Sequence, residues 1–227
     1  MKTNVLLVFI AATIISSCSK KDTASTTTPP SSDSYINLNP GSVWNYNEID
    51  SSTSTPTNSN YNVTSTSVDT PINNKKYHIY NYSYGGSEYL NLTGHDYYQY
   101  DSIPGGLGQV IERLYLEDNA AVNATWSQNF SVNITGIPFA IQGTLTNKIV
   151  ETGISKMVNG TNYTGVIHVS TIISSSAIPS SNFTSSIDSY YAPNYGLIEN
   201  SILVNLNYSG LTEYVNTKTQ LMSAVLK

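Results

Sequence analysis

Eight of the 18 tyrosines fall between residues 77 and 100, the densest group of side chains in this sequence that could do chemistry. A tyrosine combines a flat apolar ring with a hydrogen-bonding hydroxyl, so such a group could stack against sugar rings or form an amphipathic surface for a partner protein. Tyr80, Tyr82 and Tyr84 alternate with polar residues, which predicts that their rings share one strand face. The alternative is ordinary cross-strand aromatic packing, which stabilises a sheet and binds nothing.

The other reactive side chains give little support for metal binding or nucleophilic catalysis. The histidines are His78, His95 and His168; none has HxH, HxxxH or HExxH spacing, and the single cysteine adds no second ligand. On a strand, His95 and the adjacent Asp96 would point to opposite faces, and His168 is expected on a solvated face. No Gly-x-Ser-x-Gly elbow and no phosphate-binding glycine loop occurs. We therefore predict no metal site, no cofactor and no catalytic residue, and hence no enzyme.

Paired carboxylates are the remaining route to an enzyme, because glycoside hydrolysis uses two of them. The candidates are Asp96, Asp101, Glu112 and Glu117. Any acidic β-protein offers such pairs, so an envelope hydrolase is the least supported function.

Residues 1–17 have the layout of a secretory signal peptide. A short, weakly basic start is followed by an almost wholly apolar run over 5–15. As a helix this run would span about 16 Å, too short for a bilayer core of about 30 Å. Residues 15–18 read ISSC, which resembles the lipobox of bacterial lipoproteins. The resemblance implies that Cys18 carries a diacylglyceryl group and an N-acyl chain, enough for stable membrane anchoring.

Residues 18–34 are expected to form a disordered tether after the lipidated cysteine, because Ser, Thr, Pro and Asp cannot bury enough surface to order the chain. Ser19 follows the cysteine where, in many Gram-negative lipoproteins, an aspartate would favour the inner membrane. We therefore expect an outer-membrane lipoprotein, on the periplasmic face or the cell surface. Thr23 and Ser102 each follow an aspartate in a triplet that resembles the O-glycosylation motif of Bacteroidetes envelope proteins.

Residues 35–227 are long enough for one domain with a substantial core, and no change of composition divides them. Charged residues make up 11% of the chain, against about 25% in an average protein. Without Lys2 the mature chain has 15 acidic and 9 basic residues, a net charge of −6. Nucleic-acid binding needs clustered Lys and Arg, so this acidic balance excludes it.

Alternation of apolar and polar residues runs through this domain, as over 129–135, 163–173 and 198–208. A period of two is typical of strands with one buried and one wet face. Turn signals separate the runs, and Asn159-Gly160 predicts a hairpin with a primed turn. The pattern predicts an all-β domain of about ten strands with little helix. We favour a single antiparallel, strongly curved sheet or half-barrel; the alternative is a two-sheet β-sandwich.

Two local motifs resemble those of uncharacterised outer-membrane lipoproteins of Bacteroidetes. Residues 40–46 read PGSVWNY, and residues 190–198 read YYAPNYGLI. Some of those relatives look like the LolA/LolB half-barrel, whose concave face holds acyl chains. Both motifs are interpreted as structural here: Pro40-Gly41 and the segment from Pro193 to Gly196 set turns, while Trp44 and Tyr191 fill core volume.

The leading hypothesis is a membrane-anchored cell-envelope lipoprotein whose domain is a non-enzymatic binding or accessory module. Its partner would be a glycan or another envelope protein. The alternative is a carrier that holds a lipid or another apolar ligand on the concave face of the sheet. A deep apolar pocket would favour the carrier, and a flat exposed tyrosine patch the binding module.

Overall fold

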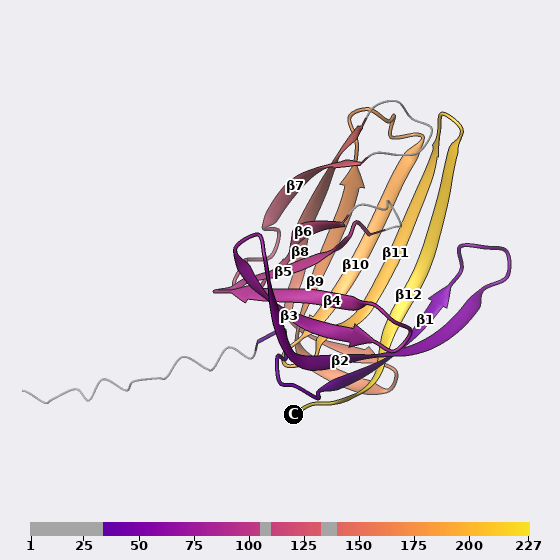
Figure 1. The fold of residues 1–227 in the computed structure, drawn as a ribbon. Coiled ribbons are helices and arrows are strands. Elements are labelled where there is room, and N and C mark those ends of the chain that lie inside the picture. The colour runs from indigo at the N-terminus through magenta and orange to yellow at the C-terminus, as the bar shows by residue number, and fades with distance from the viewer. Residues whose placement is uncertain (1–33, 105–109, 133–139) are drawn as a thin grey trace, which may run out of the picture. The chain divides into compact units, whose positions relative to one another are not determined.

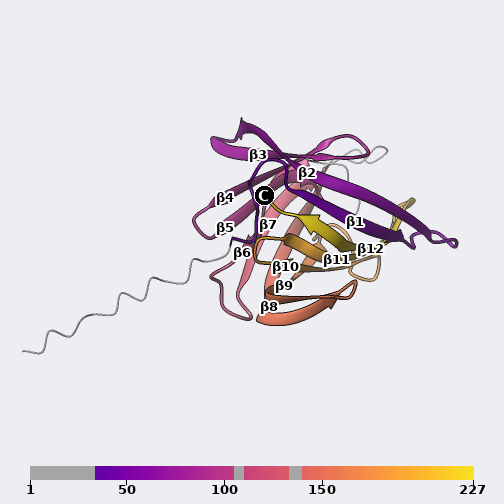
Figure 2. The same cartoon turned by 90° about the horizontal axis from the view of Figure 1, so that it is seen from below.

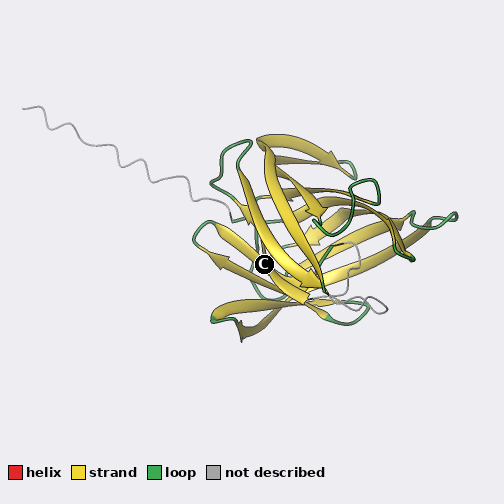
Figure 3. Cartoon of the chain, turned by 90° about the horizontal axis from the view of Figure 1, so that it is seen from above, coloured by secondary structure: helices red, strands yellow, loops and turns green. Residues whose placement is uncertain are grey.

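Twelve strands and no helix make up the part of the chain that the computed structural model describes, residues 34–104, 110–132 and 140–227 (Figures 1 and 3). No helix in these residues is long and apolar enough to cross a membrane. Cys18, Thr23 and the apolar run over 5–15 lie outside the described residues. From Asp33 to Lys227 the chain forms one compact unit.

The strands follow one another with short connections. The first six are β1 (Val43–Asp50), β2 (Thr57–Ile72), β3 (Lys75–Tyr82), β4 (Ser87–Thr93), β5 (Asp96–Ser102) and β6 (Val110–Glu117). The last six are β7 (Thr125–Val132), β8 (Ile141–Val158), β9 (Thr161–Ser174), β10 (Phe183–Ala192), β11 (Gly196–Tyr208) and β12 (Leu211–Val225).

All twelve strands belong to one antiparallel sheet. Its order is β6-β5-β4-β3-β2-β1-β12-β11-β10-β9-β8-β7, so each strand pairs with its neighbour along the chain, and β1 pairs with β12. Only β6 and β7, which follow one another in the chain, do not pair. The sheet bends round until these two edges approach each other (Figures 1 and 2). The prediction of a single, strongly curved antiparallel sheet is confirmed, and the sandwich alternative is not the fold.

Hairpin turns of the predicted kind join the long strands. Asn159 and Gly160 have φ of 46° and 81° between β8 and β9, and Ser209 and Gly210 have 53° and 82° between β11 and β12. Positive φ at both central residues is what a primed turn requires, and asparagine and glycine tolerate it best. The expected primed turn at Asn159-Gly160 is therefore confirmed.

Side chains, rather than strand pairing, connect the two edges of the sheet. Trp126 Nε1 on β7 donates to the Leu114 carbonyl oxygen on β6 at 2.9 Å, and Gln128 Nε2 donates to the Glu112 carbonyl oxygen. These bonds satisfy β6 carbonyls that a further strand would otherwise have to pair. The hydrogen bonds hold the curved sheet nearly closed without a continuous backbone ladder.

The core occupies the concave side of the sheet in two clusters. Most of the alternating positions predicted to be buried are buried where they are described, among them Phe130, Val132, Leu145 and Val204, while Ile202 and Tyr208 are partly buried. Trp44 and Tyr191 belong to the other cluster, so their interpretation as core residues is confirmed.

The expectation that His168 is solvated is wrong. His168 is 9% exposed, and its ring stacks on the Tyr190 ring with centroids 4.2 Å apart. Its Nε2 lies 2.8 Å from Asp188 Oδ1. Its strand position does point away from the core side, but neighbouring side chains of β10 cover it there.

Candidate functional site

The curved sheet encloses a cavity of about 380 Å³. Each of the twelve strands contributes at least one residue to its wall. Members of both core clusters line it, so the cavity lies where the two clusters meet and do not fill the space between them. Protein interiors are normally close-packed, so a void of this size is a feature to explain rather than a packing accident.

Tyrosine rings form one side of the cavity, and Tyr80, Tyr82 and Tyr84 are all among them. Tyr80 is 3% exposed and Tyr82 is half-buried, whereas Tyr84, just beyond the end of β3, is 68% exposed. The Tyr82 and Tyr84 rings stack with centroids 5.0 Å apart, and Tyr61 on β2 packs edge-on against both. The three predicted platform residues thus line one wall from its buried part to its solvent-exposed end, instead of forming a flat patch.

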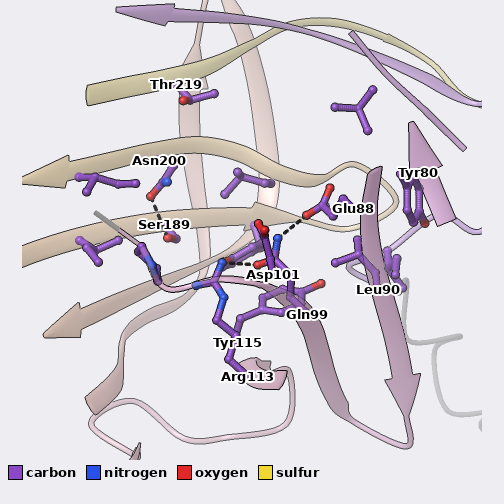
Figure 4. A pocket seen from close by; sticks show the side chains of 18 of the residues that line it. Tyr80, Glu88, Leu90, Gln99, Asp101, Arg113, Tyr115, Ser189, Asn200 and Thr219 are labelled. Carbon is purple, nitrogen blue, oxygen red and sulfur yellow. Dashed lines mark hydrogen bonds between the residues drawn. The ribbon is translucent and has the colours of Figure 1, made fainter. Parts of the chain in front are cut away.

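Beside these rings is a chain of polar side chains from three consecutive strands (Figure 4). Gln99 Nε2 on β5 donates to Glu88 Oε1 on β4 at 2.6 Å, and Arg113 Nη2 on β6 donates to Gln99 Oε1. Arg113 is the only arginine in the chain. Across the cavity, the Ser189 hydroxyl donates to Asn200 Oδ1 at 3.0 Å. The cavity wall therefore combines ring faces with hydrogen-bonding groups.

Burial raises the pKa of the Glu88 carboxyl from 4.5 to about 7, and the negative charge of Asp101 adds to the shift. Arg113 opposes it, as do hydrogen bonds from Tyr82 and Gln99. At neutral pH this carboxyl is therefore divided between its neutral and charged forms, unlike an exposed glutamate.

Two buried donors of the cavity wall have no partner among the described residues. Trp44 is 4% exposed and lines the cavity, yet its Nε1–H makes no hydrogen bond. Arg113 Nε is likewise a buried donor without a hydrogen-bond partner. Buried donors are nearly always satisfied, because an unsatisfied one costs about 1–3 kcal/mol.

A second side of the cavity is aliphatic. Ile103, Leu145, Ile187 and Ile202 line it, all from or packed against the second core cluster. The cavity wall is therefore neither wholly apolar nor wholly polar. It offers aromatic faces and charged groups on one side and hydrocarbon on the other.

Outside the cavity, Ser65, His78 and Asp69 form a hydrogen-bonded chain. Ser65 Oγ lies 2.8 Å from His78 Nε2, and His78 Nδ1 lies 2.7 Å from Asp69 Oδ1. The order is that of a serine–histidine–aspartate triad. However, Ser65 is 2% exposed, and neither Ser65 nor His78 lines the cavity. A nucleophile must reach its substrate, so here the chain of bonds joins β2 to β3 across a bulge.

The other residues singled out in the sequence are dispersed. Of the candidate carboxylates, Asp101 lines the cavity, whereas Asp96, Glu112 and Glu117 do not. Ser102 lines it too and is exposed at the end of β5. The described residues contain no group of three or more His, Cys, Asp or Glu able to hold a metal ion.

Three of the most distinctive cavity residues, Glu88, Gln99 and Arg113, were not predicted. The feature that could have identified them is the strand register, which places residues of neighbouring strands opposite one another. Glu88 pairs with Tyr80 between β3 and β4, and Gln99 pairs with Arg113 between β5 and β6. Residues directly opposite in an antiparallel pair share a face, so Glu88 faces the same side as the buried ring of Tyr80.

Comparison with protein-family models gives no match, and neither does comparison with curated protein sequences. Two solved structures are similar to the chain at low sequence identity. One is described as "a putative lipoprotein from Parabacteroides distasonis ATCC 8503"; it is 12% identical with a TM-score of 0.47, over 84% of this chain and 98% of that one. The other is described as "a putative exported protein with YmcC-like fold", from Bacteroides fragilis NCTC 9343. It is 10% identical with a TM-score of 0.42, again over 84% of this chain and 98% of that one.

Proposed function

We propose that this chain is a lipid-anchored envelope protein, attached to the outer membrane through Cys18, whose domain binds a small molecule in the cavity of the sheet. The module is non-enzymatic. We expect residues 18–34 to act as a flexible tether between the lipidated cysteine and the domain.

The observation that carries this proposal is a cavity of about 380 Å³ whose wall combines tyrosine rings with the hydrogen-bonded chain of Glu88, Gln99 and Arg113. Ligand pockets have volumes of about 300–1,000 Å³ and combine mostly apolar walls with a few placed polar groups. The cavity has such a volume, and its wall combines ring and aliphatic faces with a larger share of polar groups than most pockets have.

Binding suits the cavity better than catalysis. Glu48, Glu88 and Asp101 bring three carboxylates to the wall. Glu88 is already held by Gln99, which is itself held by Arg113. Groups fixed in a hydrogen-bonded chain are suited to positioning a ligand. The Ser65–His78–Asp69 chain, the other catalytic candidate, lies away from the cavity.

A carrier of an apolar ligand is the second candidate. The aliphatic side of the cavity, with Leu145, Ile187 and Ile202, favours it. Against it, a hydrocarbon chain filling the whole cavity would cover Glu88, Asp101 and Arg113 and leave these groups without water.

The test is a cavity-filling variant of the full-length, lipidated chain in detergent. Ser189→Phe places a ring in the cavity, and Ser186→Phe places the same ring on the same strand at an exposed position. Thermal unfolding is measured against neutral sugars, amines and the apolar probe N-phenyl-1-naphthylamine. We expect at least one polar compound to stabilise wild type and Ser186→Phe but not Ser189→Phe.

Two outcomes would contradict this proposal. If only the naphthylamine stabilises the protein, the carrier function is correct instead. If no compound distinguishes Ser189→Phe from Ser186→Phe, the cavity is not a binding site.

A further inference from the structure

We infer that the ligand of this cavity is a small organic cation, an amine or quaternary ammonium with a hydrocarbon body and a hydrogen-bond acceptor. The inference rests on the proposed function. It is drawn from the balance of charge in the cavity wall and from the arrangement of the carboxylates around the tyrosine rings.

Three carboxylates line the cavity, and they are Glu48, Glu88 and Asp101. One cationic side chain, Arg113, lines it with them, so acidic groups outnumber basic groups by three to one. None of the salt bridges in the described part of the chain includes any of the three carboxylates. A cationic ligand would supply the missing positive charge.

These carboxylates line the same cavity as the tyrosine rings. The pKa of the Tyr84 hydroxyl is raised first by partial burial and then by the negative charges of Glu48, Glu88 and Asp101. Tyr84 is 68% exposed and stacks with Tyr82, and both rings line the cavity together with the three carboxylates. Glu88 lies beside the tyrosine strand, because it pairs with Tyr80 between β3 and β4.

Ring faces carry negative potential and attract cations, with organic ammonium groups bound best where carboxylates lie nearby. The protein uses this contact elsewhere. Lys75 Nζ lies 3.2 Å from the centroid of the Tyr98 ring, and Lys156 Nζ lies 3.5 Å from that of Tyr190. Neither of those rings lines the cavity, and no lysine does. The cavity rings thus have no lysine of their own.

The other parts of the wall fit the rest of such a ligand. The aliphatic side, with Leu145, Ile187 and Ile202, accommodates a hydrocarbon body. The side chains of Ser189 and Asn200 in the wall offer hydrogen-bonding groups to a hydroxyl or carbonyl oxygen.

Glu88 links this binding to pH. The charged and titratable groups that act on it are Asp101 on β5, Arg113 on β6 and Tyr82 on β3, with Gln99 hydrogen-bonded to it. The negative charge of Glu88 also contributes to the raised pKa of further tyrosines of the wall, namely Tyr46, Tyr61, Tyr80, Tyr84, Tyr115 and Tyr191. A cation favours the ionised form of Glu88, so affinity should rise as pH increases from 6 to 8.

The experiment compares choline with its uncharged isostere 3,3-dimethylbutan-1-ol by calorimetry on the full chain. Choline keeps its charge at every pH, so any pH dependence belongs to the protein. We expect choline to bind at least tenfold more tightly than the isostere at pH 8, and up to about tenfold more weakly at pH 6 than at pH 8.

Variants separate charge from packing. Glu88→Gln should weaken choline binding and abolish its pH dependence, while Glu213→Gln, at an exposed position of β12, should change neither. Tyr84→Leu should weaken binding, and Tyr84→Phe should retain it, because phenylalanine keeps the ring face.

Equal affinity for the two compounds, or no binding of either, would overturn the cationic assignment. If a neutral sugar or the naphthylamine then stabilises wild type but not Ser189→Phe, the cavity remains a binding site and only the ligand class is wrong. If nothing enters the cavity, the proposed function fails with it.

Discussion

Trp126 on β7 donates its indole Nε1–H to the carbonyl oxygen of Leu114 on β6 over 2.9 Å, and so joins the two edges of the sheet. The same carbonyl accepts from Asn147 Nδ2 at 3.3 Å. A side chain here takes the place of a backbone ladder. The cavity depends on this contact, because Arg113, Leu114 and Tyr115 of β6 line it from one edge and Gln128 of β7 from the other.

Trp126→Phe should therefore destabilise the domain by about 1 kcal/mol, the usual net value of one hydrogen bond. Phenylalanine keeps one aromatic ring but is smaller than the indole, so the loss combines the bond between the edges with some packing against the core. Urea unfolding measures it, with Ser127→Ala at the neighbouring exposed position as control. An unchanged midpoint for Trp126→Phe would mean that the edges are held by packing alone.

Some properties of this structure can be predicted from the sequence, and others cannot. Burial alternates where apolar and polar residues alternate, so the strands containing Phe130, Val132 and Val204 could be predicted one by one. Asn159-Gly160 determines its own turn, because few other residue pairs adopt positive φ twice. These are local properties, and the sheet follows from them because each strand pairs with its neighbour along the chain.

The cavity depends instead on register, which is not local. A two-residue turn at Gly85-Gly86 would pair Tyr84 with Ser87 and Tyr80 with Asn91. The observed turn is wider and pairs Tyr80 with Glu88, a shift of three residues. An odd shift moves every side chain of β4 to the other face, so Glu88 faces the cavity only because of the turn geometry. For β4, alternation predicts two faces, but only the turn determines which of them lies on the same side as Tyr80.

The Ser65–His78–Asp69 chain should prove structural. Ser65→Ala removes the hydroxyl bonded to His78 Nε2, and we expect a loss of about 1–2 kcal/mol, because the buried ring nitrogen loses its partner. A fluorophosphonate probe should not label the native protein, since Ser65 is 2% exposed. A covalent adduct on Ser65 would instead identify the chain as a working nucleophile.

Membrane attachment should depend on Cys18, the single cysteine and hence the single lipid acceptor of this kind. Cys18→Ser should abolish incorporation of a clickable fatty acid and release the protein from the membrane fraction. Ser19→Ala is the matched control and should stay anchored. Label that persists in Cys18→Ser would show that another residue or segment provides the anchor.

Tyr82 should matter for stability, and Tyr84 chiefly for binding. Tyr82 packs against Tyr61 and Tyr84 and is half-buried, so Tyr82→Ala should cost about 2 kcal/mol, below the 3–5 kcal/mol of a fully buried ring. Tyr84→Ala should stay within about 0.5 kcal/mol of wild type, as should Tyr214→Ala at an exposed position of β12. If urea unfolding shows that Tyr82→Ala is as stable as these two variants, the ring contacts of Tyr82 add nothing to the stability of the fold.

Glu88 should make the empty domain less stable as the pH rises. Its pKa is about 7 in the folded protein against 4.5, so the folded state holds this proton more tightly than the unfolded state. Below pH 4.5 the group is protonated in both states and imposes no cost. Between pH 4.5 and 7 the unfolded chain ionises first, and stability falls progressively. Above pH 7 the loss is complete, at about 3 kcal/mol from about 1.4 kcal/mol per pKa unit.

Glu88→Gln has no such proton to lose, so it should match wild type near pH 4.5 and exceed it by up to about 3 kcal/mol at pH 8. Other acids shift the absolute stability of both proteins alike, so the difference between them isolates Glu88. Urea midpoints taken every half unit from pH 4.5 to 8.5 measure that difference, with Glu213→Gln as the exposed control. If Glu88→Gln is the less stable protein at pH 8, the ionised carboxylate is stabilised by its neighbours, and its negative charge is already balanced within the empty cavity.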